Sequence, residues 1–435
     1  MLVEFTMRNF MSYKDEVTLS MVASATVKEC ESSEGSSNVS VLDNGKRYLR
    51  SAAIYGANGS GKSSIIMAMS FFKQMVLSSF VDEKVVKDLS CRYYRFAVGC
   101  ASEPVSMQMI FLHNGLRYRL GFEVVQGVVL SECLYVLLNG SNKESYCFKR
   151  DGQDIKVNSK VLKGSGGVSS RTRTDALFLS TAAQFNVEVA LSIKNWFSNH
   201  LTILSGLDDT LAYTAETFMQ NTQIRNQILR LINIVDCCIK EVNVERLDGV
   251  AKQNLPFEIR ATHEMFEKDN VIGSEFLDFK FESLGTTKLF ALLGPFLTTI
   301  LHGGVLLVDE FGASMHTQLS MELLKLFYST MNMNGAQLIV TTHDTNLLRR
   351  DLLRRDQIWF SEKNEKGFSD LYSLVEYKVN QANSVRNDAS FSKDYLLGRY
   401  GAIPYFGNLD KFIMDYGNKN NVQILQILSA KILQN

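Results

Sequence analysis

The string GANGSGKS, which runs from Gly56 to Ser63, constrains the fold of this chain more than any other feature. It fits the pattern G-x-x-x-x-G-K-[ST], follows an apolar run typical of a strand, and precedes a helical pattern. In this context backbone N–H groups turn inward around phosphates, the lysine reaches the β and γ phosphates, and the serine hydroxyl ligates Mg²⁺. A flexible turn is the alternative, which the flanking strand and helix disfavour. The predicted nucleotide-binding residues of this loop are Gly56, Ala57, Asn58, Gly59, Ser60, Gly61, Lys62, Ser63 and Ser64.

A second apolar run, VLLVDE, ends in two acids, Asp309 and Glu310. A fully buried parallel strand has this pattern, and its acids emerge at the carboxyl edge of the sheet, where α/β proteins bind ligands. We therefore expect Asp309 to hold magnesium together with Ser63, and Glu310 to polarise an attacking water. The alternative is an ordinary core strand that ends in solvated acids.

A third apolar run, LIVTTHD, ends near His343, which lies 34 residues after Asp309 (343 − 309). A lone histidine is usually structural. A histidine at the tip of a strand that follows a phosphate-binding loop and an acidic strand is well placed to sense a γ phosphate. The predicted catalytic residues are thus Lys62, Glu310 and His343.

The bulk composition excludes little. A chain of 435 residues suggests two or three domains. Basic and acidic residues balance at 46 each, so nothing global indicates nucleic acid or membrane as a partner. The seven cysteines follow no metal-binding or secretory spacing, and the N-terminus has no signal-sequence pattern, which predicts thiols in a reducing cytosol.

One uncharged stretch, Leu289 to Val308, is long enough to cross a bilayer. Gly294-Pro295 and His302-Gly303-Gly304 interrupt it, however, and acids end it. We expect a buried helix, a turn and a buried strand, with a kink at Pro295 that costs about 3 kcal/mol. No membrane partner is predicted.

The remaining patterns divide the chain into three parts. Between about 90 and 160, Asn-Gly and Asp-Gly separate β-prone runs, which predicts antiparallel hairpins. Residues 186 to about 240 are helical in pattern, and beyond 275 the pattern is α/β again. We predict a first lobe with the P-loop and an antiparallel β subdomain over 1–189, a mainly helical insertion over 190–275, and a second lobe over 276–435.

The string ESLGTTK, residues 282 to 288, begins the apolar helix and is by itself an ordinary helix cap. Its position after a P-loop and a long insertion, and before VLLVDE, ASMH (residues 313–316) and His343, resembles the ATPase head of ABC, SMC and RecF proteins. In those families a signature motif binds the γ phosphate of ATP held by the partner subunit. The resemblance places Ser283, Gly285 and Thr286 in that role, with Thr286 where a second glycine is common. Ser283 lies 26 residues before Asp309 (309 − 283).

The resemblance adds further expectations. It implies an α/β fold, an ABC/SMC-type P-loop ATPase head, with ATP and Mg²⁺ as cofactors and composite sites in a homodimer or higher oligomer. It places ASMH in the loop that links the two sites across the dimer. It also places Gln184, in ALFLSTAAQFN, as a glutamine that contacts nucleotide and magnesium.

Several strings narrow the resemblance to compact AAA-type proteins near OLD ATPases and the RloA/AbiL group of bacterial anti-phage defence. They are RNFMSYKDEVTLSMVAS, SAAIYGANGSGKSS, ALFLSTAAQFN, QLIVTTHDTNLL, RRDQIWFSEK and DYLLGRYGAIP. This implies a cytoplasmic ATPase that acts as sensor or regulator beside a separate effector, often a nuclease, with DNA or a phage protein as candidate triggers. The 92 residues after His343 (435 − 343) show no Asp-x-Asp cluster for two-metal cleavage.

Two other functions stay open at this point. The first is a DNA-repair ATPase of RecF or SMC type that clamps DNA, and the second is a nucleotide-binding scaffold that barely hydrolyses. The basic cluster LLRRDLLRRD, residues 347–356, alternates arginine with aspartate, which favours a solvated helix face over a DNA contact. For DYLLGRYGAIPYF, core packing is favoured over a partner surface.

Overall fold

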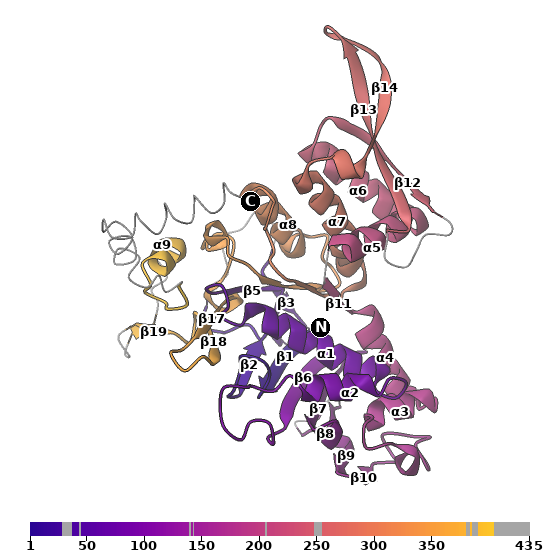
Figure 1. The fold of residues 1–435 in the computed structure, drawn as a ribbon, viewed down its shortest axis with the longest axis vertical. Coiled ribbons are helices and arrows are strands. Elements are labelled where there is room, and N and C mark those ends of the chain that lie inside the picture. The colour runs from indigo at the N-terminus through magenta and orange to yellow at the C-terminus, as the bar shows by residue number, and fades with distance from the viewer. Residues whose placement is uncertain are drawn as a thin grey trace, which may run out of the picture. The chain divides into compact units, whose positions relative to one another are not determined.

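The computed structural model describes residues 1–27, 37–42, 45–138, 141, 143–204, 207–247, 255–379, 383–384 and 390–403. Residues Met1–Ala402 belong to one compact unit (Figure 1). The end of the predicted second lobe, residues 404–435, lies outside the described residues, as do Pro404 to Phe406 of the string DYLLGRYGAIPYF.

The first layer is a six-stranded sheet in the order β11-β15-β16-β5-β17-β18. All neighbouring strands from β11 to β17 are parallel, and β18 is antiparallel to β17. Every residue of β5, β15 and β16 is buried, as continuous apolar runs in a parallel sheet require. The strands are β5 (Ser51–Tyr55), β11 (Leu201–Leu204), β15 (Val305–Val308), β16 (Gln337–Thr341), β17 (Ile358–Lys363) and β18 (Ser369–Ser373).

The second layer is a seven-stranded antiparallel sheet in the order β10-β9-β8-β7-β6-β1-β2. The predicted hairpins are confirmed: Asn114 and Gly115, which connect β6 to β7, both have positive φ (51° and 72°), the geometry that two-residue hairpin loops favour. The strands are β1 (Leu2–Arg8), β2 (Val17–Ser20), β6 (Val105–His113), β7 (Leu116–Val125), β8 (Val128–Leu137), β9 (Ser145–Asp151) and β10 (Asp154–Val157).

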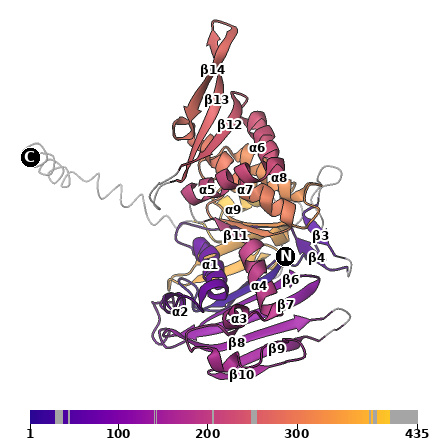
Figure 2. The same cartoon turned by 90° about the vertical axis from the view of Figure 1, so that its right-hand side faces the viewer.

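Helices α1 (Lys62–Ser78) and α4 (Glu188–Asn199) lie between the two sheets (Figure 2). The ring of Phe72 in α1 contacts Phe5 of β1, Phe122 of β7 and Phe197 of α4. This aromatic core joins the P-loop helix to the antiparallel sheet. The fold class predicted from the sequence, an α/β P-loop fold with an antiparallel β subdomain, is therefore what the structure contains.

The insertion differs from its prediction in extent and content. The predicted boundary at residue 190 falls inside α4, and β11 beyond it pairs with β15 in the parallel sheet, so the insertion begins after β11. Helices α5 (Leu207–Gln220) and α6 (Thr222–Val235) are followed by an antiparallel sheet of β12 (Ile239–Arg246), β13 (Phe257–Glu267) and β14 (Asn270–Asp278). The sequence pattern therefore predicted the two helices of the insertion correctly, but not the three strands that follow them.

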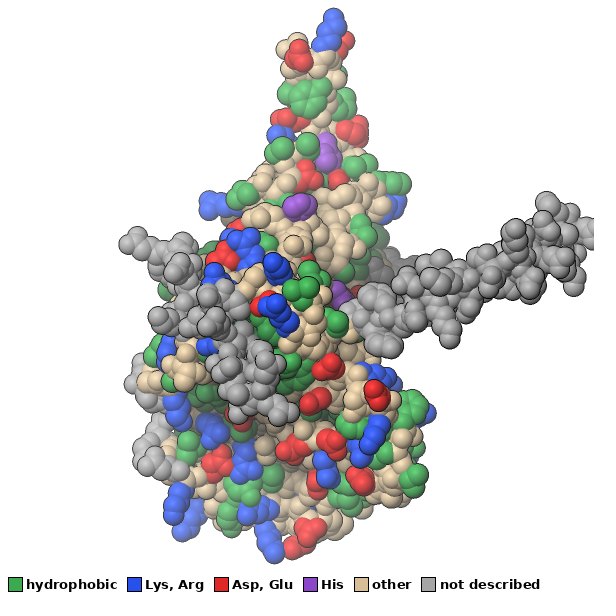
Figure 3. Space-filling model, turned by 90° about the vertical axis from the view of Figure 1, so that its left-hand side faces the viewer, with side chains coloured by type: hydrophobic (Ala, Val, Ile, Leu, Met, Phe, Trp, Pro, Cys, Tyr) green, Lys and Arg blue, Asp and Glu red, His purple; other side chains and the backbone are tan. Residues whose placement is uncertain are grey.

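The β13–β14 hairpin was not predicted because little of it is buried. Every residue of β14 up to Leu277 is exposed, and so is the outer end of β13, so no alternation of buried and exposed residues marks these strands. Hydrophobic side chains such as Phe266 and Ile272 are more than half exposed there, and the space-filling view shows such side chains at its top (Figure 3).

Helix α7 (Leu284–His302) and β15 confirm the predicted helix, turn and strand. The helix is long and apolar enough to cross a membrane by length and composition, but two thirds of its most apolar window is buried inside the protein. Pro295 lies within the helix and cannot donate a hydrogen bond to the carbonyl of Ala291. The hydroxyl of Thr214 in α5 donates to that carbonyl instead, so packing against α5 offsets part of the predicted cost.

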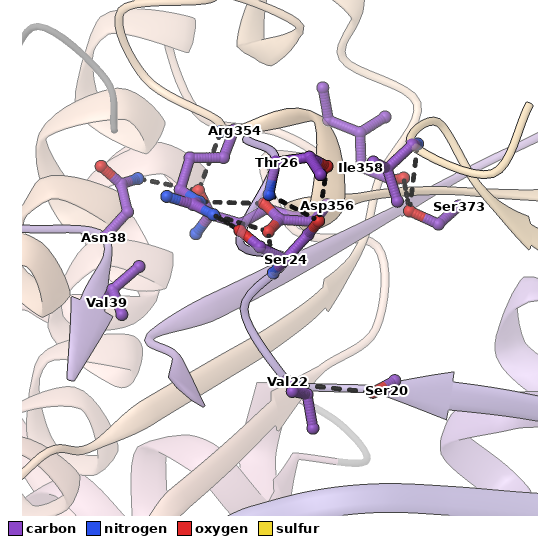
Figure 4. Close-up of polar contacts among 12 residues, drawn as sticks. Ser20, Val22, Ser24, Thr26, Asn38, Val39, Arg354, Asp356, Ile358 and Ser373 are labelled. Carbon is purple, nitrogen blue, oxygen red and sulfur yellow. Dashed lines mark hydrogen bonds and ion pairs between the residues drawn. The ribbon is translucent and has the colours of Figure 1, made fainter. Parts of the chain in front are cut away.

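The segment LLRRDLLRRD does not form the predicted helix face. Its central residues form an irregular turn between two short 3₁₀ helices. Within it, the side chain of Arg354 is only 2% exposed. The guanidinium of Arg354 makes two hydrogen bonds to Asp356 (2.7 and 2.9 Å), and Asp356 accepts from the backbone N–H of Ser24 (Figure 4). The arginine–aspartate alternation thus includes a buried structural pair that joins the N-terminal segment to β17, in addition to the exposed pair of Arg349 and Asp351.

In the segment DYLLGRYGAIPYF, Tyr395 and Tyr400 are buried in the core beside Phe360, as predicted, whereas Leu396 and Leu397 are exposed.

Several smaller elements complete the described fold. These elements are β3 (Val39–Val41), β4 (Arg47–Leu49), α2 (Lys84–Ser90), η1 (Ser169–Arg171), α3 (Phe178–Gln184), η2 (Phe279–Phe281), α8 (Thr317–Tyr328), η3 (Thr345–Leu347), η4 (Arg355–Gln357), β19 (Lys378–Val379), β20 (Asn383–Ser384) and α9 (Phe391–Leu396).

Candidate functional site

The P-loop lies between β5 and α1, at the carboxyl edge of the parallel sheet. Gly61 has a φ of 111°, and a Cβ at this position would lie 2.6 Å from Ser12 Oγ. A Cβ on Gly56 would lie 2.2 Å from the backbone oxygen of Ser361. Only glycine fits at these two positions, because β17 and the loop after β1 pack too closely against the P-loop to leave room for a side chain.

Lys62, the first residue of α1, is 5% exposed. Its Nζ donates hydrogen bonds to the backbone oxygens of Gly56 and Ala57, both at 2.9 Å, so the ammonium lies inside the loop. Burial lowers the pKa of Lys62 to about 8, although the negative charges of Asp309 and Glu310 oppose the shift. The ammonium is still mostly charged near pH 7, and a bound phosphate would favour the charged form further.

Asp309 and Ser63 meet as the sequence predicted. Ser63 Oγ donates to Asp309 Oδ1 at 3.1 Å, and the hydroxyl of Thr341 donates to the same carboxylate oxygen. Thr341 also accepts a hydrogen bond from the backbone N–H of Glu310 at 2.8 Å. A serine hydroxyl and a carboxylate at this spacing are the oxygen ligands that Mg²⁺ prefers, so the pair fits the implied metal.

Thr341 was not predicted from the sequence. It is the last residue of β16, which lies beside β15 in the sheet, so its hydroxyl reaches the acids that follow β15. The signal that could have identified it is the polar TTHD ending of an otherwise apolar strand.

Glu310 and His343 line the same pocket as the P-loop, and both side chains are exposed to it. Glu310 has a φ of 52°, an uncommon conformation for a residue other than glycine, and the Thr341 hydrogen bond helps to hold it. The pKa of the His343 imidazole is lowered by burial and by Lys62, and Glu310 and Asp309 oppose this. The imidazole is therefore neutral near pH 7 and can donate one hydrogen bond.

The pocket encloses about 600 Å³ and has a second wall, whose residues the sequence motifs did not predict. Met11 and Ser12, from the loop after β1, and five residues after α2 form this wall. Met11 N donates to Arg92 O at 2.6 Å, and Asn9 Oδ1 accepts from Tyr94 N at 3.1 Å, so the two loops are fixed to each other. The wall residues after α2 are Cys91, Arg92, Tyr93, Arg95 and Phe96. Cations and aromatic rings next to a phosphate loop suit a nucleotide, which carries negative charge and a flat base.

The prediction for Gln184 is wrong. Gln184 ends α3, is exposed, and does not line the P-loop pocket. Its neighbour Phe185 contacts the ring of Phe80, and Ser180 Oγ accepts from the backbone N–H of Phe80 at 3.3 Å, just beyond the end of α1. Since α1 has 17 residues, Gln184 lies roughly 25 Å along that helix from the P-loop.

The reason is the path of the chain after α3. The chain returns to the sheet through α4 and β11, and it is β11 that lies beside the acidic strand β15. Leu204 and Leu207, and not ALFLSTAAQFN, therefore line a pocket together with Asp309 at the carboxyl edge of the sheet.

The segment ESLGTTK begins α7, and Ser283 is the N-cap, as the ordinary interpretation of this string predicts. Ser283 Oγ accepts from Thr286 N at 3.0 Å and is 2.8 Å from Thr286 Oγ1. Ser283, Gly285 and Thr286 do not line the P-loop pocket of their own chain. Leu284, which is 56% exposed, and Phe281, which is 69% exposed, lie beside them.

The start of α7 contacts the loop that follows the acidic strand. Lys288 Nζ donates to the backbone oxygen of Ala313 at 2.6 Å, and a Cβ on Gly285 would lie 3.6 Å from Ser314 O. A smaller pocket of about 380 Å³, lined by Lys288 and Ser314 among others, also reaches Asp309 and Glu310. The predicted linking loop ASMH is thus in contact with the segment ESLGTTK within one chain, and its His316 caps α8.

Comparisons with known proteins add a partial family match. A family model described as "AAA domain, putative AbiEii toxin, Type IV TA system" matches residues 247–349, which include ESLGTTK, VLLVDE and His343 but not the P-loop. No curated protein is similar enough to this chain to be matched.

Among solved structures, the chain is similar to an SmcHead bound to the C-winged helix domain of ScpA (13% identity, TM-score 0.45, 86% of this chain and 97% of that chain covered). It is also similar to the SMC head domain from Thermotoga maritima (14%, 0.40, 86% and 98%). A third is the Smc head domain with an extended coiled coil bound to the C-terminal domain of ScpA derived from Pyrococcus furiosus (13%, 0.37, 88% and 97%). These scores are low, so the fold class rests on the strand order and the P-loop described above.

Proposed function

We propose that this chain binds ATP with Mg²⁺ and hydrolyses it to ADP and phosphate. One observation carries the proposal: Lys62, Ser63, Glu310 and His343 line one pocket, and Asp309 accepts a hydrogen bond from Ser63 at its edge. Phosphoryl transfer depends on positioning and charge stabilisation, and this set supplies both.

Each residue then has one role. The P-loop N–H groups and Lys62 bind the β and γ phosphates. Ser63 and Asp309 would hold Mg²⁺, which would neutralise charge on the phosphate oxygens. Glu310 orients and polarises the attacking water, and the neutral imidazole of His343 donates a hydrogen bond to the γ phosphate. The wall of Arg92, Arg95 and Tyr93 binds the nucleoside.

We propose further that the site is composite in a homodimer. Ser283, Gly285 and Thr286 would contact the γ phosphate held by the other subunit. The exposure of this segment, its position outside its own P-loop pocket and the helix N-terminus that it forms support this arrangement. The exposed side chains of Phe281 and Leu284 would be covered in the dimer.

The biological role that we propose is that of a cytoplasmic sensor or regulator in a bacterial anti-phage defence system, with a separate effector that cuts nucleic acid. The resemblance of the motifs to defence ATPases supports it, and so does the family description that names a toxin of a toxin–antitoxin system. An SMC-like or RecF-like ATPase that clamps DNA is equally compatible with the fold.

A phage challenge separates these two roles. Cells would express this chain alone, with its neighbouring gene, or with that gene and Lys62→Ala. Protection should require both genes and an intact Lys62. Protection by this chain alone would contradict a separate effector, and equal plaque counts in all strains would favour the DNA clamp. Phosphate release by the purified protein, measured beside Lys62→Ala, tests the hydrolysis on which either role depends.

A further inference from the structure

The turn between α6 and β12 exposes two adjacent thiols. Ile239 N donates to Asp236 O at 3.2 Å, which closes a four-residue β-turn with Cys237 and Cys238 at its two central positions. Both cysteines are exposed. Neither residue has a role in the nucleotide site proposed above.

Asp236 connects this turn to the segment ESLGTTK. One carboxylate oxygen accepts from the backbone N–H of Cys238 at 3.2 Å, and the other accepts from Thr286 Oγ1 at 3.3 Å. Thr286 Oγ1 is in turn 2.8 Å from Ser283 Oγ. The Asp236 carboxylate therefore joins the turn that holds the two cysteines to the hydroxyl of Thr286, which in turn contacts Ser283.

We propose that Cys237 and Cys238 are a thiol-modification site, at which a low-molecular-weight disulfide oxidises the pair to a vicinal disulfide and thereby alters the segment ESLGTTK. One protein thiolate attacks the small disulfide and releases one thiol. The second protein thiol attacks the mixed disulfide and releases the other. Two electrons and two protons pass from the protein to the small disulfide, which becomes two thiols.

The geometry of adjacent cysteines explains why oxidation would reach Asp236. Consecutive Cα atoms are about 3.8 Å apart, whereas disulfides usually join Cα atoms about 4.4–6.8 Å apart. Because the peptide bond fixes this distance, a disulfide between adjacent cysteines is strained, and closing its ring requires new φ, ψ and χ angles at both residues. The Cys238 N–H bond to Asp236 lies within the part of the turn that would change. A strained, exposed disulfide is also easily reduced, so the change would be reversible.

The test uses the full chain with Cys30→Ser and Cys91→Ser, because Cys30 lies outside the described residues and Cys91 lines the P-loop pocket. Treatment with oxidised glutathione should remove two hydrogen atoms from the intact mass and leave no glutathione adduct. ATP hydrolysis should fall about fivefold relative to the reduced form of the same protein, the effect expected for one lost hydrogen bond, and dithiothreitol should restore it.

Two variants in this background identify the mechanism. Cys238→Ser should show neither the mass loss nor the reversible inhibition. Asp236→Ala should still lose two hydrogen atoms, but its hydrolysis should no longer respond to oxidation. A stable glutathione adduct, or no reaction, would overturn the modification site, and a disulfide without effect on hydrolysis would overturn its link to Thr286. The inhibition rests on the proposed ATPase activity, whereas the mass measurement does not, so the two proposals can fail separately.

Discussion

The P-loop pocket and the start of α7 carry the two halves of the proposed ATP site, and they are built in different ways. In the P-loop pocket, the charged side chains are already held by neighbours: Lys62 by loop carbonyls, Asp309 by two hydroxyls. At the start of α7, the hydroxyls of Ser283 and Thr286 bond mainly to each other, and the surrounding side chains are exposed.

The difference indicates what each half requires. The P-loop half is preorganised by its own chain, which lowers the cost of ordering it when nucleotide binds. In the α7 half, Ser283, Gly285 and Thr286 lie outside the P-loop pocket of their own chain, and the two hydroxyls bond to each other. In the proposed composite site they would act on the nucleotide of another molecule. Hydrolysis should therefore depend on residues of both halves, but in separable ways.

The largest effect should come from Glu310→Gln in the P-loop half. The amide keeps the shape of the side chain but cannot polarise water, so hydrolysis should fall about 10²- to 10⁴-fold, the usual contribution of a general base. Binding of ATP should persist, and the dimer with ATP should accumulate. Phosphate release, nucleotide binding and size-exclusion chromatography measure these properties.

Lys62→Ala is the matched control, since it should lose nucleotide binding itself and form no ATP-dependent dimer. Hydrolysis by Glu310→Gln at the wild-type rate would remove Glu310 from the catalytic role.

A smaller effect should appear when the two halves are placed on different chains. Lys62→Ala and Ser283→Arg should each be inactive alone. Their mixture contains heterodimers with one intact composite site, so about a quarter of wild-type hydrolysis should return if subunits exchange freely, because roughly half of the dimers are mixed and each has one of two sites. Size-exclusion chromatography of a labelled subunit checks the exchange. Persistent inactivity despite exchange would mean that Ser283 does not act on the partner's nucleotide.

The catalytic residues of the P-loop pocket could be predicted from the sequence because each of them follows an apolar strand. GANGSGKS, VLLVDE and TTHD end β5, β15 and β16, and parallel neighbours bring these ends to one edge of the sheet. Gln184 was misplaced because it was assigned from similarity of a string, without a strand that brings it to that edge. The wall around Arg92 was missed because it depends on contacts between two loops far apart in the chain.

The smallest effect should distinguish Thr341, which the structure adds to the site, from Gln184, which it removes. Thr341→Val keeps the shape of a buried side chain but removes its hydroxyl. That hydroxyl donates a hydrogen bond to Asp309 and accepts one from the backbone N–H of Glu310. Residues that orient a metal ligand typically change metal affinity about 10- to 100-fold, so hydrolysis should require roughly tenfold more Mg²⁺. Gln184→Ala should leave the Mg²⁺ dependence unchanged, because α3 contacts the far end of α1. Hydrolysis measured across a magnesium titration compares the two variants directly. A strong magnesium defect in Gln184→Ala, with none in Thr341→Val, would mean that α3 and not β16 supports the metal site.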